Sequence, residues 1–329
     1  QFQLEGARAV HVQQPTRRRH DDDGDGDARL PCPPHRRSSR RCYSGDRPAL
    51  GGPADHFASW TPDTPCCDWF GVETPNVTGA IPDAIAGLTH LQGLILQNLP
   101  ALSGPIPRAI AKLSGLSQLI VAYTAVSGPV PSFLGALTNL VALDLSFNSL
   151  TGAIPASLAA LPNLSGINLS GNRLTGAIPP LLLSKAAGKV YDNLLLSDNH
   201  LSGTIPADFA AVNFQLIDLS GNALTGNASG LVGGANDVQW LDLSRNALSF
   251  NFSSVELPEH LYFMTISHND IYGGIPAEVA KLTSLNFFNV SYNRLCGPVP
   301  TGGNMAWFDV YNYQHNECLC GPPLPTPCT

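Results

Sequence analysis

The sequence has no long hydrophobic run and none of the short patterns that mark common catalytic sites. No stretch reaches the ~18 apolar residues of a membrane-spanning helix, so we predict no membrane span. H-E-x-x-H, G-x-S-x-G and the Walker loop are all absent. The nine histidines are scattered, and none has an evident Ser or Cys partner for nucleophilic catalysis. We therefore expect that the protein is not an enzyme.

Cysteine is missing from the centre of the chain. All eight cysteines lie towards one end or the other, where cross-links would close the ends of an elongated structure and indicate a secreted protein. No set of His and Cys residues has the spacing of a zinc finger, so we expect disulfides and neither a metal nor another cofactor. The cysteines are Cys32, Cys42, Cys66, Cys67, Cys296, Cys318, Cys320 and Cys328.

The centre instead contains a short motif that recurs at a nearly constant interval. Residues 137–155 read LTNLVALDLSFNSLTGAIP, in which Leu143 and Leu145 have the two-residue period of a strand. One copy cannot bury its leucines, so the copies must stack and share one apolar interior. The L-x-L-x-x-N step recurs at intervals of 24, 27, 23, 24, 23 and 24 residues, with its asparagines at Asn148, Asn172, Asn199, Asn222, Asn246, Asn269 and Asn293.

This period and this motif match the leucine-rich repeat. We predict an α/β solenoid, a right-handed leucine-rich-repeat superhelix with a parallel concave β-sheet and disulfide caps. Neighbouring strands would lie ~4.8 Å apart, and the motif asparagines would bond backbone groups that the turn otherwise leaves unpaired. The leucines of each strand would point inward. The side chains expected on the concave face of residues 137–155 are Val141, Asp144, Ser146 and Phe147.

Composition and cysteine positions divide the chain into four segments. The first is rich in Arg, Asp and Pro and lacks the apolar centre of a signal peptide, so we expect it to be disordered. For the last, the simplest pairing is Cys296–Cys318 and Cys320–Cys328, which the sequence alone does not prove. The segments are an N-terminal tail (1–41), an N-terminal cap (42–80), nine to ten repeats (81–300) and a C-terminal disulfide cap (301–329).

Charge is spread unevenly along the chain. Residues 1–48 contain ten of the eighteen Lys and Arg residues and seven of the twenty-five Asp and Glu residues, so the remainder has eight bases against eighteen acids. An acidic repeat domain argues against a nucleic-acid partner and favours a basic or neutral one. Asp218 and Asp242 would lie in adjacent strands, where like charges repel. A basic partner would relieve that repulsion; the alternative is that these aspartates only keep the face soluble.

The exposed strand positions form columns across the predicted sheet. The outermost column contains Tyr, Phe, Arg and His, residue types that dominate interface energetics. Trp240, Phe263 and Phe287 fall in three successive repeats, either as an exposed apolar patch or tucked under a flank. The central column is Ile95, Ile120, Asp144, Asn168, Leu195, Asp218, Asp242, Thr265 and Asn289. The outermost column is Tyr123, Phe147, Gly171, Asp198, Gly221, Arg245, His268 and Tyr292.

Six N-x-S/T sequons also favour a secreted glycoprotein. Two of them, at Asn168 and Asn289, fall on predicted strands, so not all six need be used. The other four are at Asn76, Asn163, Asn227 and Asn251.

From about Cys42 to Cys328 the chain resembles the plant polygalacturonase-inhibiting proteins. The matching stretches are ASWTPDTPCCDW, LTNLVALDLSFNSLTGAIPASLAALPNL, NVSYNRLCGPVPTGG and HNECLCGPPLP. The resemblance implies a secreted or cell-wall glycoprotein that binds fungal, and sometimes insect, polygalacturonases and blocks pectin hydrolysis. Recognition in that family uses solvent-facing positions of the concave sheet, which here include Ser165, Asn168, Asp192, Asp198, Gln215, Asp218, Gln239, Asp242 and His268. To this set our columns add Tyr123, Asp144, Phe147, Arg245 and Tyr292.

The amino-terminal cap departs from the family pattern. The family has a further cysteine just after W-x-G-V, whereas residues 69–74 here read WFGVET. We therefore expect a truncated cap in which Cys67 lacks a partner or takes Cys32. Cys42 and Cys66 remain disulfide candidates.

Two functions from different classes share this scaffold. The first is inhibition of a polygalacturonase by a monomeric protein. The second is a signalling or developmental adaptor that resembles floral repeat proteins or receptor ectodomains. Pectin itself is a further candidate ligand, although an acidic face would repel an acidic polymer at neutral pH. The bases that would contact it are Arg173, Arg245 and Arg294.

Overall fold

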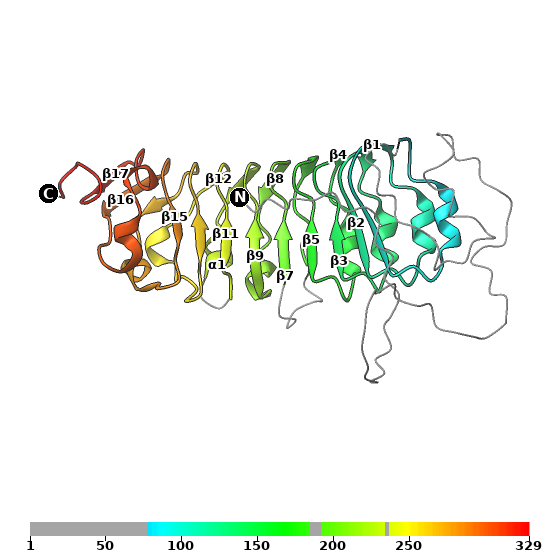
Figure 1. Cartoon of the computed structure of the whole chain (residues 1–329). Coiled ribbons are helices and arrows are strands. Elements are labelled where there is room, and N and C mark those ends of the chain that lie inside the picture. Colours follow the sequence, from blue (N-terminus) through cyan, green and yellow to red (C-terminus); the bar gives the residue numbers. More distant parts are fainter. Residues whose placement is uncertain (1–77, 184–191, 234–236, 329) are drawn as a thin grey trace, which may run out of the picture.

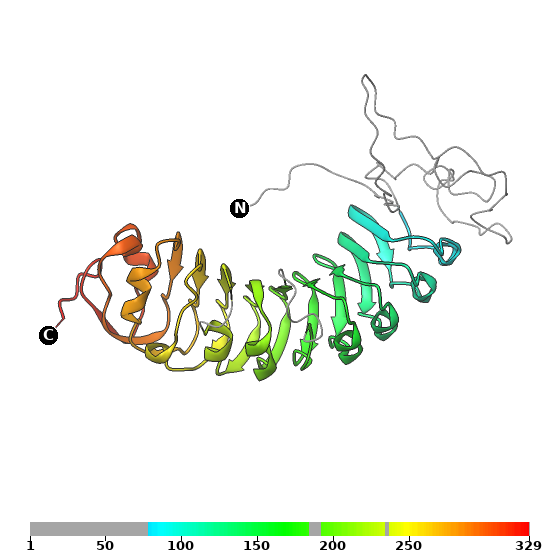
Figure 2. The same cartoon turned by 90° about the horizontal axis from the view of Figure 1, so that it is seen from below.

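The computed structural model describes residues 78–183, 192–233 and 237–328 of the chain. Over these residues the backbone coils repeatedly into an elongated stack (Figure 1). Figure 2 shows that the stack is curved, with its strands on the inner side and the helical turns of the first repeats on the outer side. The predicted α/β leucine-rich-repeat solenoid with a parallel sheet is confirmed.

Parallel strands line the concave side, one from each repeat. Each pairs with the strand of the next repeat through backbone hydrogen bonds, which places equivalent residues side by side. β1 and β2 are 12 residues long, whereas most of the later strands have 3 to 5. These strands are β1 (Gly93–Gly104), β2 (Gln118–Pro129), β3 (Ala142–Asp144), β5 (Gly166–Asn168), β7 (Asp192–Leu195), β9 (Phe214–Asp218), β11 (Trp240–Asp242), β13 (Phe263–Thr265) and β15 (Phe287–Asn289).

A second set of strands runs along one flank and joins the first through the long strand β2. The motif predicted a turn at this position but no second sheet. The flank strands pair only with their counterparts in adjacent repeats, so an isolated repeat gives no sign of them. They are β4 (Ser149–Gly152), β6 (Arg173–Gly176), β8 (His200–Thr204), β10 (Ala223–Gly226) and β12 (Ala247–Leu248). After them, a separate three-stranded sheet is formed by β14 (Tyr272–Gly273), β16 (Arg294–Pro298) and β17 (Cys318–Cys320).

The outer side is built mainly from short 3₁₀ turns. Six of them follow the proline of a G-x-I/V-P or T-I-P corner, whose fixed φ orients the chain for the turn. In the part of the chain that the structure describes, the one α-helix is α1 (Ser229–Val232). The 3₁₀ turns are η2 (Asp83–Gly87), η3 (Arg108–Lys112), η4 (Ser132–Ala136), η5 (Ala156–Ala160), η7 (Ala207–Ala211), η8 (Phe252–Ser254), η9 (Ala277–Lys281), η10 (Gly303–Trp307) and η11 (Val310–Asn312).

One hydrophobic core extends along the stack from Ile81 to Leu319. Leu143, Leu145 and Leu150 are each at most 1% exposed, as the inward positions of the motif predicted. Burial of one such side chain contributes roughly 1.5–3 kcal/mol. Because each leucine packs partly against the next repeat, the coils are stable together and not singly.

The motif asparagines form the predicted ladder. The Asn172 amide nitrogen donates to the carbonyls of Leu145 in the preceding repeat and Leu169 in its own, both at 2.9 Å. Its amide oxygen accepts the Leu150 N–H at 3.0 Å. Buried backbone groups are thereby satisfied at every turn. Asn316 extends the ladder into the C-terminal cap, a rung that the sequence motif did not reveal.

The C-terminal cap contains two disulfides, Cys296–Cys318 and Cys320–Cys328, which is the pairing predicted as simplest. The first joins the paired strands β16 and β17. Cys32, Cys42, Cys66 and Cys67, the 1–41 tail and most of the 42–80 cap lie outside the described residues. The remaining segment boundaries stay predictions.

Candidate functional site

The central column lies on the concave face in the predicted order. Backbone pairing places Asp144 beside Asn168, and Asp218 beside Asp242. Because side chains alternate along a strand, the column lies on the side of the hollow while the neighbouring residues enter the core. Thr265 is the member of the column that is buried, at 6% exposure. The register continues without interruption through Ile95, Ile120, Asp144, Asn168, Leu195, Asp218, Asp242, Thr265 and Asn289.

Ser146 corrects our expectation for the concave side chains. It is buried, at 1% exposure, and does not project from the face. The chain turns directly after the strand, which brings the serine hydroxyl to 2.6 Å from Asp144 Oδ1. The Ser146 N–H also donates to that oxygen, at 2.9 Å. A buried hydroxyl is thereby satisfied by the exposed-column residue two positions earlier.

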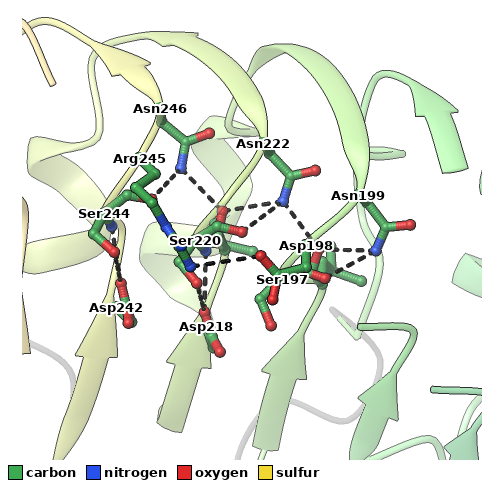
Figure 3. Close-up of polar contacts among 12 residues, drawn as sticks. Ser197, Asp198, Asn199, Asp218, Ser220, Asn222, Asp242, Ser244, Arg245 and Asn246 are labelled. Carbon is green, nitrogen blue, oxygen red and sulfur yellow. Dashed lines mark hydrogen bonds and ion pairs between the residues drawn. The ribbon is translucent and has the colours of Figure 1, made fainter. Parts of the chain in front are cut away.

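Asp218 and Asp242 are held in the same way (Figure 3). Ser220 donates to Asp218 Oδ1 through its N–H at 3.0 Å and its hydroxyl at 2.7 Å. Ser244 does the same to Asp242, at 2.9 and 2.6 Å. Both bonds use Oδ1, which fixes each carboxylate and leaves Oδ2 for a partner. Binding there requires little further ordering of the side chain.

The surroundings of Asp242 change its pKa. The pKa of Asp242 is raised to about 6, chiefly by burial and in smaller part by the charge of Asp218, while the hydrogen bonds from Ser244 and the charge of Arg245 oppose the rise. The charge of Asp218 acts in the direction expected for two adjacent aspartates. The negative charge of this part of the face changes between about pH 5 and pH 7.

The residues of the outermost column lie where the chain turns, and their backbone adopts the left-handed conformation with positive φ. Phe147 has φ 52° and Arg245 has φ 55°, and glycine occupies two of the equivalent positions, Gly171 and Gly221. At Gly171 an added Cβ would lie 2.6 Å from the ring of Phe147, which leans over it. Glycine thus makes room for the neighbouring side chain as well as for the backbone.

Gly221 has the corresponding relation to Asp198. The Asp198 carboxylate extends past this glycine towards Arg245 of the next repeat but one, at 3.5 Å (Figure 3). Both side chains are about 60% exposed, so the ion pair contributes little to stability. Its charges remain accessible to a partner.

Stacked aromatic rings occupy both ends of the outermost column. Tyr123 stacks on Phe147 with ring centroids 4.4 Å apart. His268 stacks on Tyr292 at 4.1 Å, and Tyr292 on His315 at 4.2 Å. The motif did not reveal His315, which stands one position before Asn316, as the column residues from Phe147 to Tyr292 stand one position before their motif asparagines.

Trp240, Phe263 and Phe287 stand in register on the concave face, two residues before the central column. Their rings stack with centroids 3.8 and 4.5 Å apart and planes within 8° of parallel. Phe287 is 37% exposed, and the other two are partly exposed. Of our two interpretations, the structure supports the exposed patch and not the tucked position.

The remaining predicted site residues border these columns. Ser165, Gln215 and Gln239 directly adjoin the exposed strand positions, and the Gln239 N–H donates to the Gln215 carbonyl at 2.9 Å. Asp192 is the first residue of β7. The structure therefore brings all the predicted residues to one sheet, spread over its length. Their role in binding stays a prediction.

The sequons differ in their surroundings. Asn168 and Asn289 lie on β5 and β15, as predicted, and their amide oxygens accept N–H groups of the sequon residues Ser170 and Ser291. Asn227 and Asn251 are exposed. Asn163 donates to the Thr138 carbonyl at 3.0 Å. Asn76 lies outside the described residues.

Within residues 78–183, 192–233 and 237–328, no group of three or more His, Cys, Asp or Glu is arranged to hold a metal ion. No helix in the same ranges is long and apolar enough to cross a membrane.

Comparisons with known proteins agree with the fold. A family model described as "Leucine rich repeat" matches residues 128–174. Polygalacturonase inhibitor 1 of Arabidopsis thaliana is 48% identical over 286 residues, covering 82% of this chain and 86% of the relative. Polygalacturonase inhibitor of Pyrus communis is 50% identical over 284 residues, with coverages of 82% and 85%.

Two further matches come from other named proteins. Leucine-rich repeat protein FLOR 1 of Arabidopsis thaliana is 42% identical over 307 residues, covering 87% of this chain and 93% of the relative. Among solved structures, one titled "crystal structure of a plant ice-binding protein" is 42% identical, with a TM-score of 0.77 and coverages of 83% and 92%.

Proposed function

Because this chain belongs to the family of polygalacturonase inhibitors with leucine-rich repeats, we propose that it binds a polygalacturonase through its concave face and inhibits it. The observation that supports this most is the continuous pairing of the central column across the concave strands. That pairing presents outward side chains from nine consecutive repeats on one open surface, while the leucines between them stay buried.

Inhibition on this proposal is steric. The face covers the cleft in which the enzyme binds pectin, so the polymer cannot enter, and the inhibitor forms and breaks no covalent bond. The protein has no catalytic role of its own. The free energy comes from burying the exposed columns against the enzyme.

The partner surface should be basic where it meets the central column. Asp218 and Asp242 are fixed by Ser220 and Ser244, and each has an oxygen left for a Lys or Arg side chain. Because these carboxylates are already ordered, a charge-assisted hydrogen bond to them costs little conformational entropy.

The setting of this interaction is extracellular. We propose that the protein acts in the plant cell wall, as a monomer, on polygalacturonases of fungal origin and in some cases of insects, and that it protects pectin. The disulfides of the C-terminal cap favour an oxidising compartment. Pectin is a weaker candidate ligand, because its carboxylates would meet Asp218 and Asp242.

The alternative, a signalling adaptor without inhibitory activity, has support from the relative FLOR 1. It is the less favoured function, because the two inhibitor relatives are more similar in sequence over comparable lengths. The scaffold itself is common to both.

A pectin-hydrolysis assay tests the proposal. Sugar release by a panel of fungal polygalacturonases is measured with and without the purified protein, and heat-unfolded protein is the control. We expect dose-dependent inhibition of at least one enzyme. Unchanged sugar release across the whole panel, with the protein folded, would favour the adaptor.

A further inference from the structure

The aromatic stack belongs to a row whose residues change character along the solenoid. Equivalent positions precede the central column by two residues in every repeat. In the first five repeats they are small or polar, and in the last four they are large and apolar. In order, the row is Gly93, Gln118, Ala142, Gly166, Asn193, Leu216, Trp240, Phe263 and Phe287.

The first half of this row is an internal control for the second. Gly166 and Ala142 stand in strands with the same parallel pairing as the strand of Phe263, and all three strands have buried apolar residues at the inward positions. The fold therefore does not require a large side chain at this position. Three adjacent aromatic residues on a solvent-facing sheet reduce solubility when no partner covers them. Their presence in one half only indicates a binding role.

The geometry of the rings limits what they can bind. Trp240 covers one face of Phe263, and Phe287 covers the other, at 3.8 and 4.5 Å between ring centroids. A sugar ring would need an open aromatic face, whereas this stack presents mainly ring edges. Edges form an apolar ridge suited to the aliphatic and aromatic side chains of a protein. Because each ring fixes the next, few rotamers are lost on binding.

The neighbouring column adds a charge requirement. Two residues after the ridge stand Asp242, Thr265 and Asn289, and Asp218 lies beside Asp242. The ridge is thus apolar, and the acidic pair adjoins one end of it. A complementary surface has an apolar cluster with Lys or Arg at its border.

We propose that Trp240, Phe263 and Phe287 form the apolar anchor of the partner-binding face. Their complement is an exposed apolar cluster on the polygalacturonase, bordered by basic side chains. This inference rests on the proposed function and refines it. Among the side chains of the concave face, truncation of these three should cause the largest loss of affinity for the enzyme. Central aromatic residues that exclude water are the usual hot spots of interfaces.

Substitutions taken from the same row provide the test. Phe263→Ala with Phe287→Ala introduces the side chain of Ala142, and Trp240→Gln introduces that of Gln118. Tyr272→Ala is the matched control, since Tyr272 is 46% exposed on the flank strand β14. Circular dichroism and thermal unfolding establish that each variant is folded.

The readout is the inhibition constant against the polygalacturonase that the wild-type protein inhibits best, measured at two salt concentrations. We expect the double variant to weaken inhibition by about 30-fold or more, and Trp240→Gln by about tenfold. The salt dependence should stay that of the wild type, because no charge is removed. Tyr272→Ala should change nothing.

Full potency of the folded stack variants would overturn this inference and leave the proposed function standing. If the wild-type protein neither inhibits nor binds any enzyme of the panel, both this inference and the proposed function would be overturned. If the double variant fails to fold, Trp240→Gln alone decides between the two results.

Discussion

The two halves of the concave face share a backbone and differ in what they present. In the row two residues before the central column, the concave strands β1, β2, β3, β5 and β7 have Gly, Gln, Ala or Asn. The concave strands β9, β11, β13 and β15 have Leu, Trp or Phe there. Buried apolar side chains at the inward positions and the asparagine ladder are common to both halves. The difference teaches that stability comes from inward and turn positions, which repeat, and that recognition comes from outward positions, which vary.

Core truncation should have the largest effect, and an equal one in each half. Leu145 and Leu243 are both 0% exposed, in the first and second half respectively. Leu145→Ala and Leu243→Ala should each lower the free energy of unfolding by about 2–5 kcal/mol, through lost burial and a residual cavity. Urea unfolding followed by circular dichroism measures both. A much smaller cost in one half would show that the two halves are not equivalent scaffolds.

Loss of a ladder asparagine should cost less. The Asn246 amide joins two repeats in the same way as that of Asn172. Asn172→Ala and Asn246→Ala should therefore each leave carbonyl and N–H groups unpaired at the turn. We expect about 1–3 kcal/mol for each in the same experiment. Asn139→Ala is the control, since its amide bonds the Ser114 carbonyl in an exposed position. Equal costs for all three would refute the account of the ladder.

The smallest stability effect concerns the acidic pair, and it depends on pH. The pKa of Asp242 is raised from 3.8 to about 6, so the folded state holds a proton that the unfolded state releases between those values. Stability should therefore fall as pH rises from about 4 to about 6. Asp242→Asn removes this slope and should stabilise the protein at pH 7 by about 1 kcal/mol.

Asparagine suits this position because Asn168 and Asn289 accept the same serine N–H in the same column. The control is Asp144→Asn. The column neighbours of Asp144 are Ile120 and Asn168, which are both uncharged. It should gain less at pH 7. Denaturant unfolding at pH 4.5, 6 and 7.5 provides the comparison, and an unchanged pH slope in Asp242→Asn would contradict the assignment.

The sequence predicted the columns because the motif sets both the period and the inward leucines. It did not reveal the flank sheet, whose hydrogen bonds exist only between stacked repeats. Nor did it place Ser146 inside, because the alternation of a strand ends where the chain turns. His315 and Asn316 were missed since their repeat lacks the L-x-L step, although their spacing continued the series.

The sequence predicted which residues lie on the exposed surface, but not which of them matter most for binding. Alternation along the strands identified Asp218 and Asp242, and the repeat period identified Arg245 in the turn after its strand. The aromatic stack was left between two interpretations, because burial against a flank depends on packing that spacing alone does not give. The matched row of Gly and Ala residues became informative only once the register was known.

The central claim is that outward side chains of the concave face recognise a basic enzyme surface. Its most direct test is the inhibition constant of the Asp218→Lys, Asp242→Lys double variant against a polygalacturonase that the wild-type protein inhibits. Reversed charge facing a basic partner should weaken inhibition at least about tenfold at low salt, with the solenoid still folded. Undiminished potency in a folded variant would contradict the claim.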